Sequence, residues 1–345
     1  MKVAVMGAGS WGTTVAMMCA DAGKATILWA RRPEVADEIN TDHRNQGYVP
    51  DVDLPPSLGA TSDPEEALDG AEVVILAVPS IGLKEQLNAW GGVIDRDATL
   101  ASLIKGVDVE TLRTGSQLIE DGLGCDPQRV VVVSGPNIAK ELALRLPAAT
   151  VAACGRDDRA QQVLEAMMTP YFRVYTNPDK VGVEIGGAVK NVIALAAGMA
   201  DGMGFGHNTK ATLVTRGLAE MTRLGVAMGG KALTFLGLAG VGDLVVTCSS
   251  PNSRNHTVGE RLGKGETVDE ILGHMNMVAE GVKSSRAILM LGEEAGIEMP
   301  ITGAVVQVVH EGLDPRQVVK QLMSREAKPE MHGLPHEVTQ DADTS

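Results

Sequence analysis

The chain has 345 residues, 44% of them hydrophobic, and carries a formal net charge of −14 at pH 7. Because single hydrophobic cores seldom grow beyond about 250–300 residues, we expect two domains. The 30 basic residues form no continuous stripe among 44 acidic ones, which argues against a nucleic-acid partner. The four cysteines lie far apart without a Cys-x-x-Cys pair, which argues against a zinc site or a disulfide framework and favours a reducing cytoplasm.

The amino-terminal residues predict a strand, a turn and a helix in direct succession. Lys2–Met6 is a short apolar strand, residues 7–12 form a glycine-rich turn, and residues 11–22 have a helical pattern that ends at Gly23. A second strand follows at Ala25–Trp29, which completes a βαβ unit.

The pattern of apolar residues in the rest of the chain changes near Pro178. Before this residue, further apolar runs alternate with helical patterns, which predicts a parallel sheet covered by helices on both faces. These runs are residues 73–78, 99–103, 130–134 and 150–153. After it, patterns rich in Ala, Leu, Met and Gly predict helices to about Lys320. We therefore expect an α/β domain in residues 1–178, an all-helical domain in residues 179–325 and a poorly ordered tail in residues 326–345.

The turn after the first strand is a candidate nucleotide site. Gly7, Gly9 and Gly12 match G-x-G-x-x-G between a strand and a helix, where backbone N–H groups can face a pyrophosphate. The alternative is an ordinary glycine-rich turn. Where an acidic residue would bind the ribose 2′-hydroxyl, the chain has Arg31 and Arg32. Two guanidinium groups suit a 2′-phosphate, so NADPH is favoured and NADH is possible. The alternative is a solvated helix start.

Lys190 is the candidate catalytic residue. Residues 181–200 are small or apolar, and only Glu184 and Lys190 carry charge among them. Burial disfavours the ammonium form, so such a lysine pairs with an anion or titrates low enough to transfer a proton near neutral pH. The alternative is a lysine whose stem packs while its tip reaches water.

Four further segments place polar groups where a sheet of this kind binds ligands, beyond the strand ends. They are residues 102–106, 134–141, 240–243 and 247–255. The last is expected to be a loop dense in hydroxyl, amide and guanidinium donors, which suits a phosphate. His207 and His256 lie in polar contexts and are expected to be surface histidines rather than catalytic bases.

This combination resembles the bacterial type of NAD(P)-dependent glycerol-3-phosphate dehydrogenase over nearly the whole chain. The resemblance rests on residues 7–12, 103–106, 134–136, 186–191, 200–206, 242–243, 250–255 and 280–281. It implies a Rossmann-like α/β amino-terminal domain and an all-α carboxyl-terminal domain for substrate binding and dimerisation. It also implies the reversible reduction of dihydroxyacetone phosphate to sn-glycerol 3-phosphate, which supplies glycerophospholipid synthesis.

The resemblance assigns roles to individual residues. Lys190 would donate and accept the proton while hydride passes from the nicotinamide to the ketone, without a metal. The substrate would lie against Lys105, Gly135, Asn137, Lys190, Asp243, Ser253, Arg254 and Asn255. The cofactor would lie against Gly7, Gly9, Ser10, Trp11, Gly12, Arg31, Arg32, Tyr48, Lys105, Ala139, Arg254 and Glu280. Asn137 departs from the family pattern, which most often has Ser there.

Two other functions fit parts of this pattern. A β-hydroxyacid-type dehydrogenase also uses a helix lysine followed by Asn but binds a carboxylate, and the donor-rich residues 249–255 speak against it. A non-catalytic NADPH-binding protein would have no need of Lys105, Lys190 and Asp243 together. The expected partners are a phosphorylated triose and a second copy of the chain. Membrane insertion is not expected, because glycines interrupt the uncharged run at residues 3–20.

Overall fold

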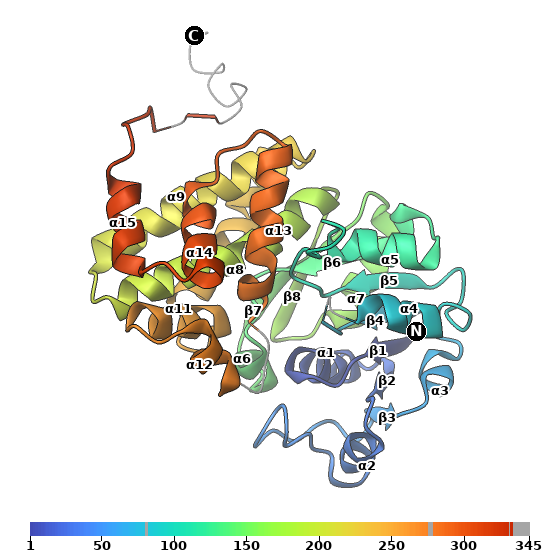
Figure 1. The fold of residues 1–345 in the computed structure, drawn as a ribbon. Coiled ribbons are helices and arrows are strands. Elements are labelled where there is room, and N and C mark those ends of the chain that lie inside the picture. The colour runs from blue at the N-terminus through green and yellow to red at the C-terminus, as the bar shows by residue number, and fades with distance from the viewer. Residues whose placement is uncertain (80–81, 275–278, 331, 334–345) are drawn as a thin grey trace.

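The computed structural model describes residues 1–79, 82–274, 279–330 and 332–333. Its amino-terminal half is a sheet flanked by helices, coloured blue to green in Figure 1, and its carboxyl-terminal half is helical, coloured yellow to red. The predicted fold class is therefore confirmed. The sheet ends at Asn177 and the first long helix begins at Lys180.

Within the described residues, the sheet has eight strands in the order β3-β2-β1-β4-β5-β6-β7-β8. The strands are β1 (Lys2–Met6), β2 (Ala25–Trp29), β3 (Gly59–Thr61), β4 (Val73–Leu76), β5 (Thr99–Ser102), β6 (Val130–Ser134), β7 (Ala148–Ala153) and β8 (Phe172–Asn177). The sequence analysis missed β3 and β8. The first has only three residues, and the second alternates buried and exposed side chains at the sheet edge instead of forming an apolar run.

The prediction of a parallel sheet is wrong at one pair, because β7 runs antiparallel to β6. The connection between them contains only the short helix α6 (Ala139–Ala143). A helix of this length does not carry the chain back along the sheet, as a parallel crossover requires. As a result, the start of β7 lies beside the carboxyl end of β6, and Asn137 Nδ2 donates to the carbonyl of Ala149 at 3.0 Å.

Helices cover both faces of the sheet, as predicted. On one face lie α1 (Ser10–Asp21), α2 (Pro33–Asp42) and α7 (Asp157–Met167), packed on Val3, Val5 and Ile75. On the other lie α3 (Pro64–Leu68), α4 (Leu83–Trp90) and α5 (Gly115–Leu123), packed on Ala4, Met6 and Leu76. Strands β1 and β4 contribute alternate residues to the two cores, which is the period-two pattern of a strand buried on both sides.

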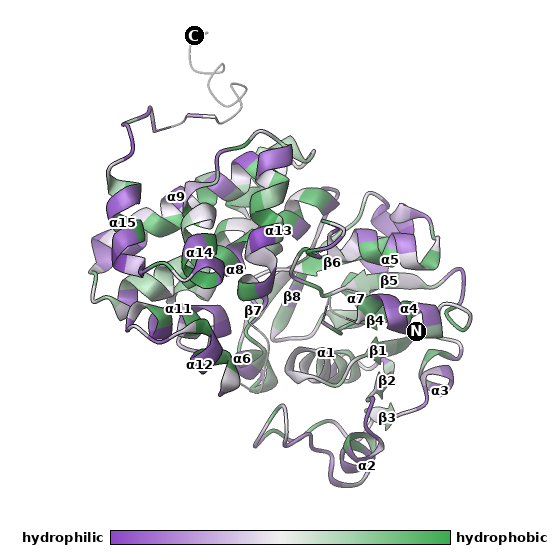
Figure 2. Ribbon diagram, in the orientation of Figure 1, coloured by the Kyte–Doolittle hydropathy of each residue, from purple (hydrophilic) through white to green (hydrophobic). Residues whose placement is uncertain are grey.

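The helical half is built around α8 (Lys180–Gly202), whose buried residues form the centre of a second core. Around it lie α9 (His207–Ala227), α10 (Asp243–Ser249), α11 (Arg254–Gly263), α13 (Glu280–Glu294) and α14 (Pro300–Glu311), with α12 (Val268–Gly273) and α15 (Pro315–Met323) further out. Figure 2 shows hydrophilic and hydrophobic residues side by side on the outer helices, for example on α15. Helix α8 is long and apolar enough to cross a membrane, but 89% of its apolar window is buried by the chain itself, as in the core helix of a globular protein.

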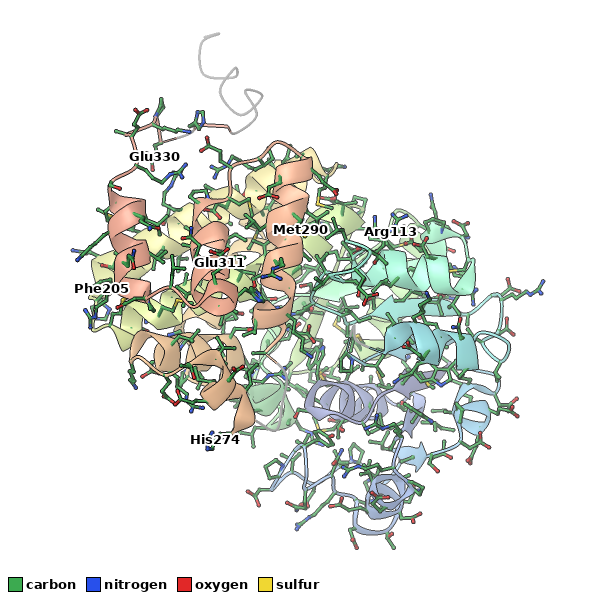
Figure 3. The ribbon with its side chains drawn as sticks, in the orientation of Figure 1. Arg113, Phe205, His274, Met290, Glu311 and Glu330 are labelled. Carbon is green, nitrogen blue, oxygen red and sulfur yellow. The ribbon has the colours of Figure 1, made fainter. Side chains whose placement is uncertain are left out.

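The last described residues lie over α9 and the start of α14. Arg216 Nη1 donates to the carbonyl of Glu330 at 2.9 Å, and Glu330 is labelled in Figure 3. Lys328 Nζ lies 2.8 Å from the Glu298 carboxylate. The prediction of a poorly ordered tail at residues 326–345 falls mostly outside the described residues.

Candidate active site

The glycine turn between β1 and α1 has the geometry that a nucleotide needs. Gly7 has φ +128°, and a Cβ at Gly12 would lie 1.8 Å from the Gly7 carbonyl oxygen, so the helix packs directly on the turn. At Gly9 no described atom lies within 4 Å of an added Cβ, which leaves the space that a pyrophosphate would enter. Gly9 is also the N-cap of α1, so the first N–H groups of a twelve-residue helix face this space.

Several of the other residues predicted to bind the cofactor lie around this turn. Ser10 Oγ donates to the carbonyl of Tyr48 at 2.8 Å, and the Arg32 guanidinium lies 5.9 Å from the centre of the Tyr48 ring. The Trp11 indole N–H is buried and has no hydrogen-bond partner among the described residues, so it could donate to a ligand. Arg31 and Arg32 are exposed just beyond β2. Thr14 Oγ1 reaches the carbonyl of Ala139 at 3.4 Å, which brings the start of α6 to the same place.

The buried Lys190 and Asp243 form a cluster with the partly buried Lys105 at the carboxyl edge of the sheet. Lys190 is 6% exposed, and its Nζ lies 2.5 Å from Asp243 Oδ1 and 2.9 Å from Thr247 Oγ1. The second oxygen of Asp243 accepts from Lys105 Nζ at 2.7 Å. Lys105 Nζ also donates to the carbonyl of Gly135 at 3.1 Å. The alternative reading of Lys190, with its tip in water, is therefore wrong.

The protonation behaviour of this cluster follows from burial and charge. Burial lowers the pKa of Lys190 to about 8, and Lys105 adds to this effect, while Asp243 opposes it. Burial alone would raise the pKa of Asp243, but the two ammonium groups lower it below its ordinary value. Asp243 therefore stays ionised, and Lys190 changes protonation close to neutral pH.

Close backbone approach brings α8 to the sheet edge. A Cβ at Gly186 would lie 2.5 Å from the carbonyl oxygen of Ala239, and one at Gly187 would lie 2.6 Å from Ser134 Oγ. Because both positions are glycine, the helix that carries Lys190 can approach both the end of β6 and the turn before α10. The small residues around Lys190 thus allow α8 to pack close to the edge of the sheet.

The segment predicted as a donor-rich loop is mostly helical. Helix α10 ends at Ser249 and α11 begins at Arg254, so the connection between them is residues 250–253. Ser253 is the N-cap of α11, and its side chain accepts from the N–H of His256. Asn255 Nδ2 donates to Asn191 Oδ1 at 2.9 Å. Arg254 is the first residue of α11 and is exposed.

Two other predicted residues complete the arrangement. Glu280 is the first residue of α13, and a Cβ at Gly106 would lie 3.3 Å from its carboxylate oxygen, so Glu280 adjoins Lys105. Burial raises the pKa of Glu280, while the nearby Arg254 and Lys283 oppose the shift. Asn137 Oδ1 is buried without a hydrogen-bond partner among the described residues, so an acceptor is available at the position that departs from the family pattern.

The prediction for His256 is wrong. This residue is 7% exposed, and its Nε2 lies 2.8 Å from Asp201 Oδ2. The polar sequence around it predicts a loop, but His256 lies in the first turn of α11, which directs its side chain toward Asp201 of α8. His207, by contrast, is exposed at the start of α9, as expected.

The sequence analysis assigned no role to Thr247, Asn191 or Glu184, although all three lie in segments that it singled out. Thr247 follows Asp243 by one helical turn, so both face Lys190, and a helical reading of this segment would have shown it. Asn191 Nδ2 donates to the carbonyl of Lys105 at 3.1 Å. Glu184 is 5% exposed and accepts from the Ser116 N–H at the start of α5, so it ties α8 to the sheet half.

A dinucleotide turn and a lysine–aspartate–lysine cluster at the carboxyl edge of one α/β sheet define the class of nicotinamide-dependent oxidoreductases. The family model described as NAD-dependent glycerol-3-phosphate dehydrogenase N-terminus matches residues 2–160, and the model of the C-terminus matches residues 179–320. The chain therefore belongs to the NAD-dependent glycerol-3-phosphate dehydrogenase family.

Individual relatives agree with this assignment. The chain is 54% identical over 330 residues to glycerol-3-phosphate dehydrogenase (NAD(P)+) of Streptomyces griseus, covering 96% of this chain and 98% of that protein. It is 54% identical over 331 residues to the protein of the same name from Corynebacterium urealyticum, covering 96% and 100%. The crystal structure of glycerol-3-phosphate dehydrogenase from Coxiella burnetii has a TM-score of 0.88 and 36% identity, covering 94% of this chain and 99% of that chain.

Proposed function

We propose that this chain catalyses the reversible reduction of dihydroxyacetone phosphate to sn-glycerol 3-phosphate with NADPH or NADH. The observation that carries the proposal is the Lys190 ammonium, buried against Asp243 at the same carboxyl edge of the sheet as the glycine turn. Membership of the glycerol-3-phosphate dehydrogenase family supports the substrate.

Each residue of the site would have its own role in this reaction. The turn from Gly7 to Gly12 would hold the cofactor, whose nicotinamide would supply the hydride for the ketone carbon. Lys190 gives a proton to the developing alkoxide, and Lys105 stabilises the negative charge that forms there. Asp243 holds both ammonium groups in place through its two oxygens. Arg254 would bind the phosphate by paired hydrogen bonds, near Ser253, Asn255 and the turn at Gly135 and Asn137.

A cofactor oxidation assay tests the proposal. Purified protein is mixed with NADPH or NADH and with dihydroxyacetone phosphate, and loss of absorbance at the reduced nicotinamide band is followed. We expect turnover with dihydroxyacetone phosphate and little with short semialdehyde acids. Preference for the semialdehydes would favour the β-hydroxyacid-type alternative, and binding of cofactor without any ketone reduction would favour a non-catalytic protein.

A rise in pH should slow the reduction of dihydroxyacetone phosphate and speed the oxidation of sn-glycerol 3-phosphate. Lys190 donates its proton during reduction, so kcat/KM for dihydroxyacetone phosphate should fall as pH rises through about 8. During oxidation of sn-glycerol 3-phosphate the neutral amine accepts a proton, so kcat/KM should rise over the same range. Initial rates at several pH values, in buffers of equal ionic strength, give both profiles. A flat reduction profile up to pH 10 would contradict the role of Lys190.

Cofactor preference should depend on Arg31 and Arg32. The double substitution Arg31→Ala with Arg32→Ala should raise KM for NADPH by roughly tenfold or more and change KM for NADH much less, because two charge-assisted contacts to the 2′-phosphate are lost. Arg44→Ala is a suitable control, since Arg44 lies in an exposed pair with Asp53. Equal changes for both cofactors would show that these arginines do not read the 2′-phosphate.

We further propose that residues 1–178 form a cofactor domain and that residues 179–325 form a substrate domain. We also propose that the enzyme is a cytoplasmic homodimer whose product supplies lipid synthesis. The exposed Leu233 and Leu236 support self-association, since they are 76% and 65% exposed. A groove of about 600 Å³ lined by Val241, Val245 and Ser249 lies on the outer face of α10, opposite Asp243. Sedimentation analysis of the purified protein tests the dimer.

A further inference from the structure

Helix α11 contacts α8 through glycines on both helices, so that their backbones touch. A Cβ at Gly198 would lie 2.1 Å from the carbonyl oxygen of His256, and one at Gly259 would lie 2.1 Å from that of Leu195. These contacts fix the position of α11 along the axis of α8. Lys190 belongs to α8 and Arg254 is the first residue of α11, so the helix pair sets the separation of the two cations.

Two side chains fix the rotation of α11 about its own axis. Asn255 Nδ2 donates to Asn191, and Asn255 Oδ1 accepts from the N–H of Gly281 at 2.9 Å. His256 Nε2 lies 2.8 Å from Asp201 Oδ2. Both side chains are buried, and successive helical residues point about 100° apart. Asn255 and His256 therefore hold the first turn from two directions, while Arg254 faces the exposed side.

The Asp201 end of this contact is itself held. Its Oδ2 also accepts from Lys210 Nζ at 2.5 Å, which links the end of α8 to the first turns of α9. The carboxylate is thus anchored by a second helix and cannot easily follow a movement of α11. His256 is therefore bound to a fixed point of the same helix that carries Lys190.

We propose that Asp201 and His256 are positioning residues for Arg254, which hold α11 in the rotation that directs the guanidinium to the substrate phosphate at a set distance from Lys190. The proposal rests on the proposed reduction of dihydroxyacetone phosphate. The guanidinium stands at the end of a long side chain, so a small rotation of α11 displaces it much further than the helix backbone. A displaced guanidinium would bind the substrate phosphate less tightly, while Lys190 and Asp243 keep their places.

The test compares KM with kcat. His256→Ala should raise KM for dihydroxyacetone phosphate roughly tenfold or more. Because Lys190 and Asp243 keep their contacts, kcat should stay within about threefold of the wild-type value. His256→Gln, whose amide can still donate to Asp201, should recover most of the lost affinity. His207→Ala is the matched control, since His207 is exposed at the start of α9, and it should leave KM unchanged.

A double-mutant cycle separates positioning from general destabilisation. In an Arg254→Ala background, His256→Ala should cause little further loss of kcat/KM, because the residue that it positions is gone. An equal loss with and without Arg254, or an unchanged KM in His256→Ala, would overturn the proposal. If His256→Ala does not fold, the same cycle is made with Asp201→Asn. Absence of dihydroxyacetone phosphate reduction by the wild-type enzyme would instead overturn the proposed function, and this inference with it.

Discussion

Replacing Lys190 with Ala should reduce turnover by roughly two to four orders of magnitude, the usual contribution of a general acid. Lys190 Nζ donates to both Asp243 Oδ1 and Thr247 Oγ1. Among the described residues no other cation makes both hydrogen bonds, so none can replace the lysine at this position. Cofactor binding should change little, because the glycine turn is untouched. Steady-state kinetics with dihydroxyacetone phosphate and a separate fluorescence titration of NADPH measure the two effects.

Lys190→Met distinguishes loss of the ammonium from loss of packing. Methionine fills most of the same space without a charge, so it should show the same loss of turnover as Lys190→Ala and a higher melting temperature than Lys190→Ala, because it leaves a smaller cavity. Asp243 would keep its contact with Lys105 in this variant. Lys264→Ala removes a surface lysine paired with Glu260 and should change neither quantity. Near-normal turnover in Lys190→Met would rule out Lys190 as the proton donor.

Replacing Asp243 with Asn should have the second largest effect, because it leaves the buried ammonium of Lys190 and the partly buried ammonium of Lys105 without their shared anion. Loss of one partner from a buried ion pair costs about 3–5 kcal/mol when the remaining charge stays buried. Lys190 can relieve part of this cost by losing its proton, since Asp243 is the group that raises its pKa. We therefore expect a lower melting temperature, a turnover reduced by roughly 100-fold or more, and a reduction profile whose fall moves to lower pH.

Asp53→Asn provides the comparison for Asp243→Asn. Asp53 forms a pair with Arg44 on the surface, where the aspartate side chain is 80% exposed, so its loss should cost at most about 1 kcal/mol. Thermal unfolding of both variants and pH–rate profiles of the active ones supply the data. A reduction profile of Asp243→Asn that keeps its fall at the wild-type pH would show that Asp243 does not control the protonation of Lys190.

The local features of this protein could be read from its sequence. The order of strand, Gly7 to Gly12 and helix is set by residues next to one another, because turn geometry and helix packing there depend on glycine at fixed spacing. The burial of Lys190 was evident from its apolar neighbours. The resemblance to a known family then predicted which distant residues belong to one site.

The tertiary structure alone decided the pairings between distant residues. Local periodicity contains no information on which partner Asp243, Asn255 or His256 would meet, since Asp243 reaches Lys190 across 53 positions and His256 reaches Asp201 across 55. The antiparallel β7 likewise followed from the shortness of α6 and its packing. The amino-acid sequence by itself thus determined the α/β half, the nucleotide turn and the buried lysine, because these depend on neighbours along the chain. Packing of α8 against α10 and α11 decided the side-chain contacts that orient the site. These contacts form only when glycines let the helix backbones come close enough to hold one another in place.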